Sequence, residues 1–355
     1  MKNRPEFIND LRSAVANYFE ENRISKYGNK DLVVKTIFMM SIYLIPYLLM
    51  VSGIITSFWG VLGIWILMGI GKAGIGMSIM HDANHRSYSN NQKVNKWLSK
   101  TMYIIGGFPF NWQYQHNTMH HGFTNIEGHD EDIDPGGYLR FSPHKQLRKI
   151  HKYQHIYAWF LYGLMTISWV VGKDFNQLNR YRKEKVKLNT RLSYRRLFGT
   201  LVISKILYYA FLLVIPIIVV PIAWYWIVVF FILMHFTTGL ILTTIFFFFF
   251  VVSFAEFPLP DKDLAMENNW AIHQLMTTSD FAPGNRILSW FIGGLNYQVE
   301  HHLFPNISHV HYPKISEFVR ETARKHNLPY HVQPGFIRAV VEHGRMLKKL
   351  GRPAI

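Results

Sequence analysis

Residues 61–85, VLGIWILMGIGKAGIGMSIMHDANH, decide the fold. Residues 61–80 are apolar except for Ser78 and one charge, Lys72. A helix of about 20 apolar residues is long enough to cross a bilayer. Residues i and i+4 of a helix point the same way, so His81 and His85 could hold one metal ion where this helix leaves the membrane. The segment therefore predicts a membrane-crossing helix that carries two histidines to one membrane face.

Two further histidine clusters follow apolar segments in the same way. They are His116-Asn-Thr-Met-His120-His121 and Gln298-Val-Glu-His301-His302. Imidazole suits iron, zinc and copper, whereas harder ions prefer carboxylates, so seven clustered histidines indicate a transition-metal centre. A single HxxxH pair recurs by chance. Three clusters in one chain predict a site that one membrane face brings together.

The composition also favours a membrane protein. Of the 355 residues, 49% are hydrophobic and only 17% are charged, whereas soluble domains average about 25% charged residues. The chain contains no cysteine. This excludes disulfides, thiolate-ligated haem, cysteine-bound iron–sulfur clusters and cysteine zinc sites.

The net charge of +16 does not indicate a nucleic-acid partner, because its distribution follows the membrane. Lys and Arg gather in the N-terminal arm, in residues 140–196 and at the C-terminus, whereas the predicted turns at 58–60 and 221–224 carry none. This positive-inside pattern predicts that both termini are cytoplasmic. The basic stretch 173–196 suits anionic lipid headgroups, with capture of a phosphate-bearing acyl carrier or docking of an acidic electron donor as alternatives.

We expect residues 1–355 to form one all-α membrane domain with four transmembrane helices, in two hairpins, under a cytosolic helical cap. Its predicted parts are a cytosolic arm (1–35) with an amphipathic helix at 5–22, a first hairpin (36–80, crossing at 36–60 and 61–80), a cytosolic and interfacial region with two clusters (81–196), a second hairpin (197–257, crossing at 197–220 and 223–252) and the cap (258–355). The apolar segments 101–112 and 156–172 are short, so we expect them to lie on the interface or re-enter it.

The residues around the three clusters resemble those of the integral-membrane fatty acid desaturases. The matching strings are His81-Asp-Ala-Asn-His85, His116-Asn-Thr-Met-His120-His121-Gly-Phe-Thr-Asn125 and Asn296-Tyr-Gln-Val-Glu-His-His-Leu-Phe-Pro305. They look like the front-end branch, in which glutamine replaces the first histidine of the third cluster. The resemblance covers nearly the whole chain and implies a four-helix transmembrane cone under a cytosolic domain that holds two non-haem iron ions. It also implies use of O2 to insert a cis double bond into the acyl chain of an acyl-CoA or acyl-lipid.

The resemblance further implies which residues form the site. It assigns metal binding and catalysis to His81, His85, His116, His120, His121, His301 and His302, and to His273 upstream of the third cluster. Asn269, four residues before His273, would contact the metal through water. Gln298 would bind metal weakly through its amide oxygen, or hold a water or a neighbouring ligand by hydrogen bonds.

Other polar residues have more ordinary interpretations. Ligating histidines usually donate their second ring N–H to a carboxylate or carbonyl, and the candidate acceptors are Asp82, Glu300, Asp130, Asp132 and Asp134. For Asp130 and Glu131, a solvated charge or a helix cap is the favoured interpretation. Lys72 lies in a predicted crossing, where snorkelling or internal pairing is favoured over a role near the substrate. For His235, packing or hydrogen bonding between helices is favoured over metal binding. The histidines at 129, 144, 151, 155, 309 and 311 are expected to be surface or interfacial groups.

Many eukaryotic front-end desaturases carry a fused cytochrome b5 domain with a His-Pro-Gly-Gly haem motif. This chain has Asp134-Pro-Gly-Gly137 instead, and its N-terminal arm is too short for such a domain. We therefore expect a separate electron-transfer protein, either a ferredoxin or cytochrome b5.

Two alternative functions remain open. A membrane hydroxylase or ketolase of acyl, sphingoid or carotenoid chains would share the diiron site, and only its product separates it from a desaturase. A zinc-dependent membrane hydrolase or a metal-binding receptor belongs to another class. Such zinc sites need about three protein ligands and an open position, which is fewer than the eight histidines assigned here.

Overall fold

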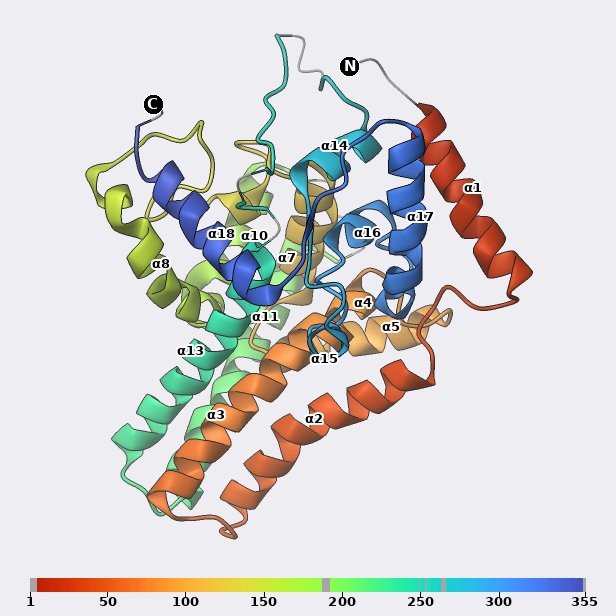
Figure 1. The fold of residues 1–355 in the computed structure, drawn as a ribbon. Helices are drawn as coiled ribbons and strands as arrows, with labels where there is room; N and C mark the ends of the chain where they lie inside the picture. Colours follow the sequence, from red (N-terminus) through yellow and green to blue (C-terminus); the bar gives the residue numbers. More distant parts are fainter. Residues whose placement is uncertain (1–4, 187–191, 249, 253, 263–265, 354–355) are drawn as a thin grey trace.

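The computed structural model describes residues 5–186, 192–248, 250–252, 254–262 and 266–353, and these residues are mostly helical. Within them, four helices are long and apolar enough to cross a membrane: Lys30–Val51, Phe58–Asn84, Tyr194–Val219 and Trp224–Phe247. Figure 1 shows them as an elongated bundle, with the shorter helices gathered at one end. The four predicted membrane helices are therefore present.

The first helix begins and ends earlier than the sequence predicted. Helix α2 (Lys30–Val51) starts inside the predicted arm because the Asn29 side chain caps it by accepting the N–H of Leu32. The turn lies at 52–57 rather than at 58–60, and Gly53 adopts a φ of +78° there, a conformation that favours glycine. Hydropathy could not place this turn, because Ile54 and Ile55 are as apolar as the helices beside it.

The second membrane helix carries the first cluster. Helix α3 (Phe58–Gly74) continues through a π-helical turn, Ile75–Met80, into α4 (His81–Asn84). Such π-helical turns occur frequently at functional sites.

The third membrane helix is also interrupted by a π-helical turn, and the fourth is shorter than predicted. Helix α11 (Tyr194–Tyr209) also passes through a π-helical turn, Ala210–Val214, into α12 (Ile215–Val219). Helix α13 (Trp224–Phe247) ends before the predicted limit of residue 252.

Helix α3 packs between α2 and α13. Glycines allow the backbones to approach closely. A Cβ atom added to Gly69 would lie 2.8 Å from the carbonyl oxygen of Met234, and one added to Gly239 would lie 2.5 Å from that of Gly163. The helix that carries His81 is thus held by its neighbours over most of its length.

Four buried polar residues form one hydrogen-bonded network between the helices. The Lys72 Nζ donates to the Tyr208 hydroxyl at 2.6 Å, and this hydroxyl lies 2.9 Å from His235 Nε2. The His235 Nδ1 lies 2.9 Å from the Thr166 hydroxyl. The predicted internal pairing of Lys72 and the hydrogen-bonding role of His235 are both confirmed.

Short helices connect the two pairs of membrane helices. They are α5 (Gln92–Ser99), α6 (Thr101–Ile104), α7 (Pro109–Trp112), α8 (Gln154–Gly163), α9 (Met165–Ser168) and α10 (Asp174–Lys183), with π-helical segments Gln113–His120 and Trp169–Lys173 and 3-10 turns Glu131–Ile133 and Lys149–Tyr153. The stretches Lys149–Gly163 and Met165–Lys183 meet at a bend of 54°, as in a broken span or a re-entrant loop. The predicted interfacial segment 156–172 lies within this bent pair.

The C-terminal cap, residues 266–353, covers the end of the bundle opposite the helix turns (Figure 1). It contains α14 (Trp270–Thr277), α15 (Arg286–Phe291), α16 (Gln298–Leu303), the 3-10 turn His309–His311, α17 (Tyr312–Lys325), α18 (Phe336–Leu350) and two parallel strands, β1 (Asp280–Phe281) and β2 (Val332–Gln333). Asp280 pairs with Val332. The predicted amphipathic helix is confirmed as α1 (Pro5–Glu21), which buries Phe7, Leu11 and Val15 and packs on α17.

Candidate metal centre

The seven clustered histidines come together from three places in the chain. His81 begins α4 and His85 follows its end. His116 and His120 lie in the π-helical segment Gln113–His120, and His121 follows directly. His301 and His302 lie on α16. Six of the seven residues are at most 5% exposed, and the Nε2 of His85 is also buried.

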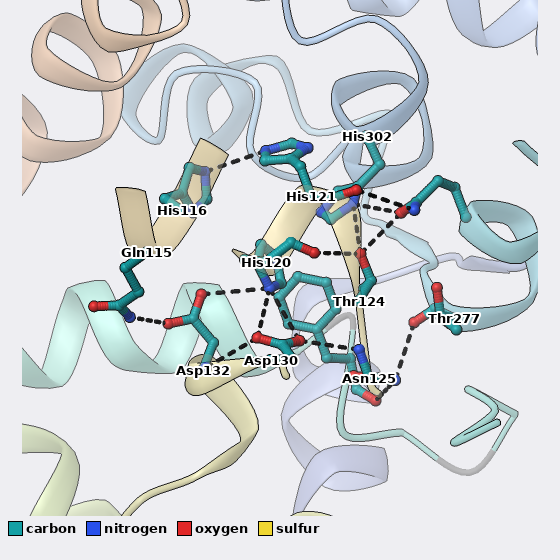
Figure 2. Close-up of polar contacts among 12 residues, drawn as sticks. Gln115, His116, His120, His121, Thr124, Asn125, Asp130, Asp132, Thr277 and His302 are labelled. Atoms are coloured by element: carbon teal, nitrogen blue, oxygen red, sulfur yellow. Dashed lines mark hydrogen bonds and ion pairs between the residues drawn. The ribbon is translucent and has the colours of Figure 1, made fainter. Parts of the chain in front are cut away.

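Ring nitrogens from all three clusters converge. The ligand atoms of His81, His85, His116 and His301 all lie within 4.8 Å of one another. The His116 Nε2 is 3.2 Å from His81 Nε2 and 3.3 Å from His121 Nε2, and Figure 2 shows the second contact. The rings of His121 and His302 stack with their centroids 4.4 Å apart. The third cluster is therefore joined to the second.

The local helix geometry differs from the α-helical spacing that the sequence suggested. His116 and His120 lie in a π-helix, and the N–H of His121 bonds to the carbonyl of His116. This i→i+5 pattern is that of a π-helix. It brings His121 as well as His120 beside His116, which the i, i+4 rule alone does not predict.

Five rings have a buried nitrogen without a hydrogen-bond partner among the described residues. These atoms are Nε2 of His85, His120, His301 and His302, and Nδ1 of His121. An unpaired buried polar atom costs about 1–3 kcal/mol, so five in one cluster are unfavourable unless something binds them. Imidazole nitrogens suit iron, zinc and copper. The donor set therefore fits a transition-metal centre.

Two carboxylates contact the Nδ1 of His120, the ring nitrogen opposite its unpaired Nε2. The His120 Nδ1 lies 3.1 Å from both carboxylate oxygens of Asp130 and 3.4 Å from Oδ2 of Asp132 (Figure 2). Because carboxylates accept, Nδ1 carries the hydrogen, and in the neutral ring Nε2 keeps a lone pair. Metal-binding histidines are typically oriented in this way.

The two histidines of α16 have outer partners of a different kind. The His302 Nδ1 donates to the amide oxygen of Gln274 at 2.7 Å. The His301 Nδ1 lies 3.1 Å from the Tyr312 hydroxyl. Helices α14 and α17 thus fix the two rings of α16, and both Nε2 atoms remain for a ligand.

Burial keeps most of these rings neutral, which is the state that binds metal. Burial, followed by the charges of neighbouring histidines, lowers the pKa of five rings well below the usual value: His85, His116, His121, His301 and His302. His120 differs. Burial lowers its pKa, but the charges of Asp130 and Asp132 outweigh this effect and raise the pKa above its usual value.

Comparison with known proteins shows which family has these features. The family model for fatty acid desaturases matches residues 57–334. This chain belongs to the fatty acid desaturase family. The resemblance seen in the sequence is confirmed, and with it an enzyme of the oxidoreductase class.

Curated relatives cover almost the whole desaturase chain. It is 34% identical to the sn-1 linoleoyl-lipid 6-desaturase of Arthrospira platensis, over 97% of this chain and 92% of the relative. It is 31% identical to the protein of the same name from a Synechocystis species, over 96% of this chain and 94% of the relative. It is also 31% identical to the acyl-lipid (8-3)-desaturase of Physcomitrium patens, over 98% of this chain and 72% of the relative.

His273 lies at the edge of the desaturase cluster, and one of its ring nitrogens is already used. Its Nε2 contacts the carbonyl oxygen of Thr124 at 2.8 Å, so this nitrogen carries the hydrogen. A bond to metal would have to come from Nδ1. His273 is buried, but its role as a ligand remains a prediction.

The two amides assigned to the site have partners close to them in the chain. The Asn269 oxygen caps α14 by accepting the N–H of Ile272 at 3.1 Å. The Gln298 side chain is buried at the start of α16 and donates to the carbonyl of Leu295 at 2.7 Å. Both amides shape the helices that carry histidines, and their contact with metal remains a prediction.

Among the described residues, two of the five predicted carboxylates contact a clustered histidine by a hydrogen bond or ion pair: Asp130 and Asp132. Asp130 also caps the turn Glu131–Ile133 by accepting the N–H of Asp132 at 2.9 Å. The cap was expected, but the solvated surface charge is wrong because Asp130 is only 2% exposed. Glu131 pairs with Arg180, and Asp134 pairs with Lys145 instead of a histidine.

The remaining two carboxylates, Asp82 and Glu300, lie within the clusters but bond to residues outside them. The Asp82 carboxylate accepts from His309 Nδ1 at 2.9 Å and from the Ser308 hydroxyl at 2.8 Å. The Glu300 carboxyl accepts from the Tyr330 hydroxyl at 3.1 Å. The prediction that His309 is a surface group is wrong, because Asp82 gives it a partner in the interior.

His151 is also buried rather than exposed. Its Nε2 lies 3.1 Å from the carbonyl oxygen of Gly137.

Sequence reasoning missed Gln274 and Tyr312. Gln274 follows His273 directly, and Tyr312 lies ten residues after His302. No spacing rule points to either residue, because only the folded cap brings α14 and α17 against α16. The signal that identifies them is the hydrogen bond to an outer ring nitrogen, which exists only in three dimensions.

Asp130→Asn tests the orientation of His120. This change removes the charge beside His120 Nδ1 but keeps the size of the side chain. Loss of such an outer partner typically lowers metal affinity or activity by about 10–100-fold, and we expect that loss in a titration of the metal-free desaturase with Fe²⁺. Asp134→Asn is the matched control, because its carboxylate pairs with Lys145. Equal affinities in the two variants would contradict this role of Asp130.

Proposed function

We propose that this desaturase inserts a cis double bond into the acyl chain of a membrane lipid, using O2 and two iron ions held by the clustered histidines. One observation carries the proposal: seven imidazoles converge in a buried site, and five of their nitrogens have no partner among the described residues. The relatives support the lipid-bound substrate over acyl-CoA, since two are named linoleoyl-lipid desaturases and one an acyl-lipid desaturase. The string Asn296–Pro305, which has Gln298 in place of a histidine, supports the front-end type.

The histidines divide into two groups around His116. We assign His81, His85, His116 and His301 to one ion, since their ligand atoms lie within 4.8 Å of one another. We assign the remaining rings, His120, His121 and His302, to the second ion, together with His273. The His120 and His302 ring centroids are 5.0 Å apart, and His116 Nε2 lies close enough to His121 to serve either group.

The protein residues position and protect the site. Methylene C–H bonds do not yield to side-chain acids and bases, so a cofactor must carry that step, and bound iron would supply the activation of O2. Asp130 and Gln274 hold the Nδ1 hydrogens of His120 and His302, which leaves each Nε2 for metal. Burial excludes water from the rings. The acyl chain would be held with one pair of carbons against this site, and such positioning is itself a large part of catalysis.

Among the alternatives, a hydroxylase or ketolase shares this site, and the names of the relatives favour desaturation. No feature of the described structure favours a zinc hydrolase or a receptor over a desaturase, since seven histidines exceed the three or so ligands that such zinc sites use.

Product analysis tests the proposed reaction. We expect cells that lack front-end desaturation to gain new double bonds between an existing one and the carboxyl end when they express this protein, with the bonds located by mass spectrometry of the lipids. His301→Ala should abolish the product. His129→Ala is the control, because that histidine is exposed. A hydroxyl or keto product would favour the alternative chemistry.

We further propose that the histidine site and both termini face the cytoplasm. One support is that Lys and Arg concentrate outside the predicted turns between the membrane helices. The other is that α1 and the end of α18 lie opposite those turns (Figure 1). A separate cytoplasmic ferredoxin or cytochrome b5 would deliver electrons there. Adding each purified carrier to the purified desaturase identifies the donor as the one that supports turnover.

Single cysteines test this orientation, because the native chain has none. In intact cells, an impermeant thiol reagent should label Thr56→Cys and Ala223→Cys in the two turns but leave Arg352→Cys unlabelled until the cells are opened. All three positions are exposed, so access depends only on the side of the membrane. Labelling of position 352 alone would reverse the orientation.

A further inference from the structure

An apolar groove lies between α2 and the short helices α5 and α6. Its volume is about 560 Å³, within the range of roughly 300–1,000 Å³ seen for pockets that hold small ligands. Met40, Leu44 and Ile104 form part of its wall. The Thr101 hydroxyl and the Lys100 ammonium group lie among these apolar side chains. The groove therefore combines a hydrocarbon lining with a local positive charge.

The groove faces the surface of a membrane helix. Ile37 and Ile45 of α2 line it and are 62% and 52% exposed, and α2 is one of the four candidate membrane spans. Transfer of such side chains from water into hydrocarbon is favourable. The lining residues 36–45 lie in the middle of α2, and the N-terminal end of this helix runs towards α5 (Figure 1).

Helix α5 has the features of a helix at the membrane surface. It buries Asn95, Leu98 and Ser99, whereas Trp97 is 67% exposed and Lys100 directly after the helix is also exposed. Tryptophan concentrates at the membrane–water interface, and lysine keeps its charge in water above an apolar stem. Trp97 and Lys100 both line the groove, so its charged part would lie at the level of lipid headgroups.

The buried side of α5 rests on the first histidine cluster. Leu98 packs in the same core as Met80 and Ala83, which flank His81. The Ser99 hydroxyl donates to the side-chain oxygen of Asn84 at 2.6 Å, and Asn84 precedes His85. Helix α5 therefore contacts both the groove and the segment that carries the first histidine cluster.

We propose that the lipid-bound substrate enters the enzyme through this groove, with its acyl chain along α2 and an anionic headgroup phosphate at Lys100. The apolar wall complements the chain, and the exposed cation complements the phosphate. The inference rests on the proposed desaturase function and adds to it the place where the substrate leaves the bilayer.

Photo-crosslinking tests the groove directly. The full-length protein is placed in phosphatidylglycerol vesicles that contain a trace of the same lipid with a diazirine in its acyl chain. Labelled positions, mapped by mass spectrometry, should concentrate in residues 36–45 and 97–104. Ser41→Trp places a large ring in the groove and should reduce labelling there by about tenfold, with a similar loss in the rate of lipid desaturation. Ile218→Trp is the control, because Ile218 on α12 is 75% exposed and lies outside the groove.

Lys100→Glu provides an independent variant at an exposed position, where folding is not at risk. It should reduce labelling by the phosphatidylglycerol probe more than labelling by a phosphatidylcholine probe. Labelling spread evenly over all membrane helices and unchanged by Ser41→Trp would show ordinary boundary lipid and overturn the proposal, as would labelling by a photoreactive acyl-CoA alone. A wild-type protein that makes no double bond would instead contradict the proposed function.

Discussion

The candidate centre depends on burying seven imidazole rings against one another. A neutral imidazole has one N–H and one lone-pair nitrogen, so each ring needs two partners. Asp130, Gln274 and Tyr312 satisfy outer nitrogens, while five other ring nitrogens have no partner among the described residues. Metal binding would turn this cost into a gain, since the energy of binding becomes energy of folding. The apolar core and the cap can then be understood as the means of holding the rings in place.

The membrane bundle and the cap contribute different parts of that support. The close contact at Gly69 holds α3 against α13, and the close contact at Gly239 holds α13 against α8. The helix that leads into His81 is therefore packed tightly in the bundle. The cap brings α16 against the end of the bundle that carries His81, and it packs α14 and α17 against α16. The partners of His301 and His302 come from those two helices. A change in the cap therefore acts on the histidines through their outer hydrogen bonds.

The clusters, the family and the number of membrane helices could be predicted from the sequence, because histidine spacing and long apolar runs are local patterns. The turn at 52–57 was missed because Ile54 and Ile55 hide it within an apolar run. The cap formed by Asp130 was expected, but its burial beside His120 was not favoured, because the folding of residues 121–130 leaves no local pattern. His309 was misplaced for the same reason, since its partner Asp82 lies far away in the chain. Spacing identifies the candidate ligands, but several of the residues that orient them come from distant segments.

The iron content of the purified protein tests the central claim most directly. The protein would be produced with ample iron, and iron and zinc would be counted together with activity after iron reconstitution, because histidine-rich proteins can take up the wrong metal. Eight histidines exceed what one ion coordinates, so the account predicts about two irons per active chain. One zinc ion per chain, with no capacity for iron, would contradict it.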